Sequence, residues 1–297
     1  MEQNTINAVL LPVALGVIMF GLGLALRVED FLRVFVYPRV VVIALGCQML
    51  VLPAVCLGIA HLFRMPSELA VGLMLLAASP GGTVANLFSH LARGDVALNI
   101  TLTAVNSVLS LITMPLIVSF SLEHFLGASR AIPLPVDKVV QVISIVLAPA
   151  VIGMIVRVRW SRLADRLDRP VRLLSAVFLS GVVLAAVIAE RTRLGTALLQ
   201  VGPPALVFNL ASMAIGYFVP RLARIGQRQA IAIGMEIGLH NGALAIAIAF
   251  HVLGRPVMAL PPAVYSLLMF FTAAAFGYAV APRGRAELAP ASWGAAE

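Results

Sequence analysis

Apolar segments of about twenty residues, separated by short polar loops, follow one another along almost the whole chain. A helix of about 20 apolar residues is needed to cross the hydrocarbon core of a bilayer. The pattern therefore predicts an all-α polytopic membrane protein with nine transmembrane helices. They are expected near residues 8–26, 39–62, 67–92, 96–119, 139–156, 173–189, 200–219, 230–252 and 258–281.

The composition supports a lipid environment. Apolar residues make up 61% of the chain, charged residues only 11%, and the mean hydropathy is +1.02; a soluble domain carries about 25% charged residues. Residues 1–7, before the first apolar segment, contain no Lys or Arg, so we expect a retained helix and not a cleaved signal peptide. Cys47 and Cys56 lie in one predicted helix and are too far apart along it to bridge, so we expect small buried residues.

Basic residues divide unequally between the two sides of this topology. Of 21 Lys and Arg residues, 15 fall in the loops 27–39, 93–95, 157–172 and 220–229 and in the tail 282–297. The positive-inside rule therefore predicts an inner (plasma) membrane protein with its N-terminus outside and its C-terminus in the cytoplasm. Because this arrangement explains the net charge of +8, we expect no nucleic-acid partner; membrane lipid is the expected contact of the 157–172 cluster.

Two predicted spans carry helix-breaking residues in their interiors: Ser79-Pro-Gly-Gly-Thr83 in the third and Gly238-Leu-His-Asn-Gly242 in the eighth. Paired breaks at membrane depth are typical of a transporter's binding site, whereas an ordinary kink is the alternative for one break alone. An offset of five spans reverses the direction of crossing. We therefore predict one transporter domain, 1–297, built as an inverted repeat of 8–119 and 139–281, with two discontinuous helices crossing at the midplane.

Glu236 is the only one of 13 acidic residues in the middle of an apolar segment. A buried carboxylate of this kind normally faces a cavity, a partner or an ion; the alternative is a protonated carboxyl that hydrogen-bonds a neighbouring helix. Half-helices that start at the breaks would point N–H groups inward and favour an anion. Half-helices that end there would point carbonyl oxygens inward and, with Glu236, favour a small cation such as sodium.

Three motifs together resemble the bile acid:sodium symporter family: Ser79-Pro-Gly-Gly-Thr-Val-Ala-Asn86, Leu91-Ala-Arg-Gly-Asp-Val-Ala-Leu98 and Glu236-Ile-Gly-Leu-His-Asn241. The likeness covers almost the whole chain, from residue 16 onward. It implies a secondary transporter in which a panel of helices packs against a core domain that contains the two crossing discontinuous helices. Some members have ten helices, and this chain is similar to the nine-helix form.

The resemblance also implies the site residues. One sodium ion would be held by Asn86, Asn99, Thr103 and Glu236, with the position of Ala85 contributing. A second would use Gln48, Glu236, Ile237, Leu239 and His240. By analogy with the family, the substrate would contact Gly82, Thr83 and Asn241, for which helix capping is the alternative role. The other polar residues of the spans, Asn106, Ser107, Ser110, Thr113, Asn209 and Ser212, are expected to form interhelical hydrogen bonds.

Three positions depart from the family pattern, which has Ser at positions 85 and 99 and Gln at position 240. Asn99 keeps an oxygen ligand, and Ala85 loses only a hydroxyl. His240 supplies nitrogen in place of a carbonyl oxygen, which puts the second sodium site in doubt. Proton coupling through Glu236 and His240 is therefore an alternative to sodium coupling.

The expected function is sodium-coupled symport of an organic anion by alternating access. Bile-acid-like steroids and small carboxylates such as pantoate are both open as substrates. The alternatives are a proton-coupled or uncoupled organic anion carrier, a channel, and a ligand-binding receptor. An enzyme is not expected, because the spans contain no third metal ligand beside Glu236 and His240 and no nucleophile or phosphate-loop motif. We expect no prosthetic group and no obligate protein partner.

Overall fold

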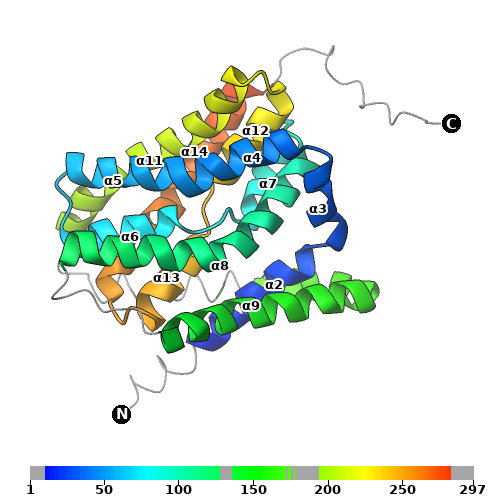
Figure 1. Ribbon diagram of the computed structural model, residues 1–297, viewed down its shortest axis with the longest axis horizontal. Helices are drawn as coiled ribbons and strands as arrows, with labels where there is room; N and C mark the ends of the chain where they lie inside the picture. The colour runs from blue at the N-terminus through cyan, green and yellow to red at the C-terminus, as the bar shows by residue number, and fades with distance from the viewer. Residues whose placement is uncertain (1–10, 128–135, 172, 175–176, 178–193, 282–297) are drawn as a thin grey trace.

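The computed structural model describes residues 11–127, 136–171, 173–174, 177 and 194–281 (Figure 1). Within these ranges every regular element is helical, and one isolated bridge pair, Gly81 with His240, interrupts the pattern. The predicted all-α class is therefore confirmed for the described part of the chain. Most of the sixth predicted span, 173–189, and the whole tail 282–297 lie outside it.

The helices follow the predicted apolar segments closely. The first half of the chain contains α2 (Leu11–Ala25), α3 (Val28–Leu32), η2 (Arg33–Phe35), α4 (Pro38–Gly46), the π-helical turn η3 (Cys47–Val51), α5 (Leu52–Leu62), α6 (Ser67–Ala77), α7 (Thr83–Leu91) and α8 (Val96–Leu126). The second half contains α9 (Val136–Arg159), α11 (Leu194–Leu222), α12 (Gln227–Gly238), α13 (Gly242–His251), η4 (Pro256–Ala259) and α14 (Leu260–Val280).

Three unbroken helical segments of the described chain are long and apolar enough to cross a bilayer: Pro38–Leu62, Leu199–Leu222 and Pro256–Val280. A fourth is formed by the two halves of α8, Val96–Ser110 and Ile112–Leu126, which meet at 57°. Pro115 explains the bend, because its ring clashes with the carbonyl of the residue four positions earlier. The count of nine helices stays a prediction.

The broken spans explain part of the difference between nine predicted helices and the four long segments found in the described chain. α6 and α7 have 11 and 9 residues, and α12 and α13 have 12 and 10. At 1.5 Å per residue, such helices are about 13 to 18 Å long, roughly half of a ~30 Å hydrocarbon core. Each half-helix therefore reaches only partway across, and two in succession are needed to span the bilayer.

α2 and α9 form a closely packed pair along one edge of the molecule (Figure 1). A Cβ on Gly23 would overlap the backbone of Ala150, and a Cβ on Gly153 would overlap the backbone carbonyl of Phe20. Small residues of this kind let transmembrane helices approach closely. Beyond each other, α2 contacts α13, α9 contacts α8, and Leu24 of α2 packs with Ala164 and Val171.

The centre of the remaining helices is formed by α6 and α12, whose residues 69–77 and 230–238 are all buried. Large apolar side chains on outer helices are instead exposed, as for Leu50, Leu199 and Phe271. This distribution is expected where lipid, and not water, surrounds a protein. It places Glu236, in α12, in the middle of the helical core.

Candidate functional site

The two breaks cross and pair with each other. Gly82 N–H donates to Leu239 O at 2.8 Å, and Asn241 N–H donates to Pro80 O at 2.8 Å. The bridge pair Gly81 and His240 lies between these bonds. Each break thus satisfies backbone groups that the other exposes, which is required of non-helical backbone at membrane depth. The two breaks expected from the sequence therefore lie together and bond to each other.

The second half-helices begin at this crossing. Gly82 precedes the first residue of α7, Thr83, and Asn241 precedes the first residue of α13, Gly242. Asn241 Oδ1 accepts a hydrogen bond from Leu244 N–H at 3.1 Å, so this side chain does cap its helix. Gly82, Thr83 and Asn241, the expected substrate contacts, therefore lie together where two helix N-termini meet.

Glu236 reaches the crossing from the last turn of α12. Its side chain is 1% exposed, and its Oε2 accepts a 2.6 Å hydrogen bond from Thr103 Oγ1 of α8. A Cβ on Gly81 would overlap both carboxylate oxygens. The carboxylate therefore packs directly on the backbone of the first break, and a side chain at position 81 would require it to move.

Glu236 Oε1 belongs to a set of buried side-chain atoms that have no hydrogen-bond partner. Buried polar atoms are normally paired, and an unpaired one requires an explanation such as an ion or ordered water. Within the described residues they number six, and five belong to predicted sodium ligands. The six are Gln48 Oε1, Asn86 Oδ1, Ser89 Oγ, Asn99 Oδ1, Glu236 Oε1 and His240 Nε2.

This atom set suits a hard cation. Hard cations take oxygen ligands from carboxylates, amides and backbone carbonyls, and five of the six unpaired atoms are oxygens from a carboxylate, three amides and a hydroxyl. Glu236 supplies the negative charge. The residues present therefore fit sodium on the chemistry of their donors.

Gln48 lies against the first break from the π-helical turn η3. Its Nε2 donates to Ser79 O at 3.0 Å, so the unpaired Oε1 belongs to an amide already held at the crossing. π-helical turns inside α-helices are frequent at functional sites, because the extra residue redirects the side chains that follow. The turn thus explains how a residue in the middle of 38–62 reaches the break.

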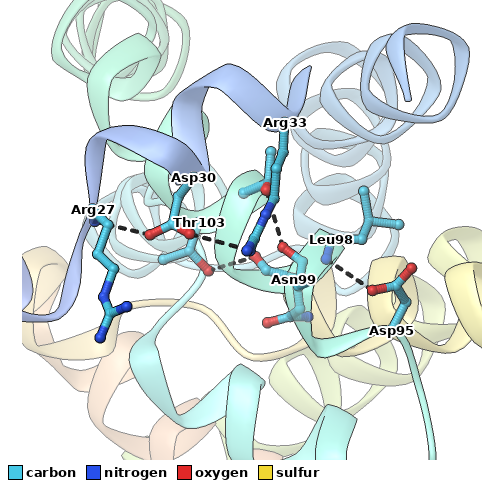
Figure 2. Close-up of polar contacts among 9 residues, drawn as sticks. Arg27, Asp30, Arg33, Asp95, Leu98, Asn99 and Thr103 are labelled. Atoms are coloured by element: carbon cyan, nitrogen blue, oxygen red, sulfur yellow. Dashed lines mark hydrogen bonds and ion pairs between the residues drawn. The ribbon is translucent and has the colours of Figure 1, made fainter. Parts of the chain in front are cut away.

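Asn99 and Thr103 lie one turn apart on α8, whose first turn is capped by Asp95 accepting from Leu98 N–H at 3.0 Å (Figure 2). Asn99 Nδ2 donates to Ala232 O of α12 at 2.7 Å, which leaves Oδ1 unpaired. Both side chains therefore contact α12, one at Ala232 and the other a turn further on at Glu236. Ala85 on α7 is fully buried, and Asn86 beside it has an unpaired Oδ1.

The second set of expected ligands lies at the end of α12. Ile237 O lacks its usual helical partner, because Asn241 N–H donates to Pro80 O instead. Leu239 O already accepts from Gly82 N–H and keeps one lone pair. Gly238 O is occupied, since it accepts from Asn209 Nδ2 at 2.9 Å and from Tyr265 Oη at 2.8 Å.

His240 is held by aromatic packing. Its ring stacks on Phe208 with centroids 5.6 Å apart and planes 5° apart, and Nδ1 lies 3.3 Å from Ser79 O. Nε2 has no partner. The imidazole therefore occupies a defined position at the crossing and has one nitrogen without a partner. The other expected ligands of this set lie nearby in the sequence or across the break: Gln48, Glu236, Ile237 and Leu239.

Two buried polar residues, Ser89 and Asp30, were not identified from the sequence. Ser89 was not expected in the site, although it follows Asn86 by one helical turn. Asp30 is 4% exposed and accepts from Arg27 N–H at 2.8 Å and from Arg33 Nη1 at 3.3 Å (Figure 2); its position in a short polar loop gave no sign of burial.

Most hydroxyls expected between helices bond within their own helix. The expectation of interhelical bonds was wrong for Ser107, Ser110 and Thr113, each of which donates to a carbonyl three or four residues earlier. Ser212 donates to Phe208 O within its own helix and also interacts with Tyr265 of α14. Such a carbonyl is always within reach of a helical hydroxyl, whatever the neighbouring helices present. Asn209, whose longer side chain reaches Gly238 O, does bond across helices as expected.

Fold and site together define a multi-pass α-helical membrane protein whose central polar site is built where two discontinuous helices cross. The chain belongs to the sodium bile acid symporter family, whose model matches residues 12–196. This confirms the resemblance read from the three motifs.

Relatives with transport names cover most of the chain. It is 28% identical over 257 residues to the uncharacterized sodium-dependent transporter YocS of Bacillus subtilis, covering 86% of this chain and 78% of that protein. It is 26% identical over 264 residues to the probable sodium/metabolite cotransporter BASS2, chloroplastic, of Oryza sativa, covering 88% and 61%. For BASS1, chloroplastic, of Arabidopsis thaliana, the identity is 26% over 259 residues, covering 86% and 62%. The chain thus spans about three fifths of the plant relatives, and these names agree with a transporter and not an enzyme.

Proposed function

We propose that this protein is a sodium-coupled symporter that moves an organic anion across a membrane by alternating access. Membership in the sodium bile acid symporter family and the sodium-dependent names of YocS and the plant relatives support the class of activity. The observation that carries the proposal is the set of buried side-chain oxygens without a hydrogen-bond partner, which includes Glu236 Oε1 and three more predicted sodium ligands.

The cation positions share the Glu236 carboxylate. One uses Asn86, Asn99, Thr103 and Glu236 from α7, α8 and α12. The other uses Gln48, Glu236, Ile237, Leu239 and His240. His240 would either coordinate the ion through nitrogen or not coordinate it, in which case only the oxygens of the other four residues would bind. A single carboxylate between two cation positions makes each ion's binding depend on the other, because both neutralise the same buried charge.

The anion would bind at the N-termini of α7 and α13. Each N-terminus carries about half a positive charge, and Gly82, Thr83 and Asn241 lie where the two half-helices begin at the crossing. Cations bound near Glu236 would add positive charge close by. Anion and sodium would therefore stabilise each other, which is the physical requirement for symport. A bile-acid-like steroid and a small carboxylate such as pantoate both carry the required anionic group.

Alternating access would follow from movement between the α2–α9 pair and the other helices. The pair is packed tightly within itself, because Gly23 and Gly153 let the two backbones touch, and it would move as a unit. In the proposed orientation the protein lies in the inner (plasma) membrane with its C-terminus in the cytoplasm.

The test is the melting temperature of the purified protein in sodium, potassium or choline chloride at equal ionic strength, beside Glu236→Ala. We expect a rise specific to sodium that the variant lacks, since ligands that bind the folded state stabilise it. No sodium-specific rise in the wild type would refute the proposal. A response to pH without preference for sodium would instead indicate proton coupling through His240, whose Nε2 is unpaired.

Transport by a carrier is tested separately from binding. In proteoliposomes, sodium-driven uptake should saturate with anion concentration, because each cycle moves a bound substrate. Flux that grows linearly with concentration would indicate a channel, and binding without flux would indicate a receptor.

A further inference from the structure

Ser89 is the one residue with an unpaired buried side-chain atom that the family pattern does not assign to the cation positions. It lies on α7, is 0% exposed, and its Oγ has no partner among the described residues. Serines inside helices usually donate to a carbonyl one turn earlier. Ser107, Ser121 and Ser212 do so here, so Ser89 is an exception in the same protein.

The position of Ser89 continues the predicted cation site along α7. Residues three and four apart share a helix face, so Ser89 lies on the same face as Asn86 and Ala85, one turn closer to the end of the helix. That end leads into the turn 92–95, on the predicted cytoplasmic side. Ser89 is therefore further from the midplane than the expected ligands.

Gly94 makes room for the Ser89 hydroxyl at the point where the turn 92–95 packs on α12. Gly94 N–H donates to Ser89 O at 2.8 Å, and a Cβ on Gly94 would lie 2.6 Å from Ser89 Oγ and 3.2 Å from Ala232 N. Ser89 Oγ and the Ala232 backbone thus border the same small space. Ala232 is the residue whose carbonyl is held by Asn99 Nδ2.

These contacts order the polar atoms along α12. Glu236 meets Thr103 near the midplane, Ala232 one turn away meets Asn99, and Ser89 lies beside Ala232 at Gly94. We propose that Ser89 Oγ is a further sodium-coordinating oxygen. It lies at the end of this series nearest the turn 92–95, and sodium would contact it while moving between the Glu236 site and that side of the protein. The inference rests on the proposed sodium coupling and extends it.

The test compares Ser89→Ala and Ser89→Cys with the wild type in full-length protein, using sodium chloride titrated against choline chloride and the melting temperature as readout. Both changes keep the size small and remove the hard oxygen. We expect the half-saturating sodium concentration to rise roughly tenfold or more, the effect of losing one contact to a charged group. The sodium-free melting temperature should stay at the wild-type value, and Ser89→Cys carries the test if Ser89→Ala fails to fold.

Ser121→Ala is the matched control. Ser121 is also 0% exposed, but its hydroxyl donates to Ile117 O at 2.6 Å within α8. This variant should lower the sodium-free melting temperature without changing the half-saturating concentration. A wild-type half-saturating concentration in both Ser89 variants would overturn the inference while leaving the proposed function intact. A wild type without sodium stabilisation would overturn both.

A double change identifies the cause. Gly94→Ala should press on Ser89 Oγ and weaken sodium binding, and adding Ser89→Ala should weaken it no further, because both changes disturb the same oxygen. Fully additive losses would contradict the inference.

Discussion

Replacing Gly81 by alanine tests whether the carboxylate of Glu236 must rest on the backbone of the first break. The added Cβ would overlap both carboxylate oxygens, so the side chain has to move by about 1 Å or more to restore van der Waals contact. That movement breaks the 2.6 Å hydrogen bond from Thr103 Oγ1. A hydrogen bond to a charged group contributes about 1.5 to 3 kcal/mol.

The expected consequence is a selective loss of sodium binding. If the lost contact acts only on the cation-bound arrangement, the half-saturating sodium concentration rises roughly tenfold to a hundredfold. Overpacking also lowers the free energy of unfolding in choline by about 1 to 3 kcal/mol. The assay is the melting temperature of purified protein across a sodium titration without substrate, read as the increment that sodium adds.

Gly82→Ala is the neighbouring control. A Cβ there would lie 3.6 Å from Leu239 O, an ordinary contact, and its φ of −93° suits alanine. The half-saturating sodium concentration should therefore stay near the wild-type value in Gly82→Ala and rise in Gly81→Ala. Equal half-saturating concentrations in both variants would refute the idea that Gly81 positions the carboxylate.

Four further changes separate sodium binding from packing. Thr103→Val keeps the shape but removes the donor to Glu236, so the half-saturating sodium concentration in the same titration should rise about tenfold; an unchanged value would exclude Thr103 from the site. His240→Gln places an amide where Nε2 is unpaired and should enlarge the sodium increment, whereas an unchanged sodium and pH response would mean that this position is not a ligand. Tyr265→Phe leaves Gly238 O with one donor fewer and should cost about 1 kcal/mol in thermal unfolding, with the sodium increment retained. Gly153→Ala pushes α2 from α9 and should cost about 1 to 3 kcal/mol and slow uptake in proteoliposomes; wild-type uptake would contradict a rigid α2–α9 pair.

Features carried by single residues were predictable from the sequence. Pro80, Gly81 and Gly82 in succession disfavour a continuous helix, and a carboxylate within an apolar run requires a partner, so both breaks and Glu236 could be identified from the sequence. The motifs around them also predicted the family that the family model confirms. The sodium ligands and the repeat boundaries remain predictions.

Features that depend on a neighbouring helix were predicted poorly. Asp30 is buried although its loop is polar, and Ser107 and Ser110 bond within α8 although interhelical bonds were expected. Ser89 looked like an ordinary helical serine. Its distinctive property is an unpaired hydroxyl, which depends on the turn at Gly94 bringing it beside α12.

By itself, the sequence determined where helices begin, break and end and which residues are too polar for lipid, because backbone restriction and transfer free energy belong to each residue and its nearest neighbours. Only the tertiary structure decided that the two breaks bond to each other, that Gly81 faces Glu236, and that Asn99 reaches Ala232 from a distant segment. These contacts join residues more than 130 positions apart. They depend on how whole helices pack, which no local pattern of residues records.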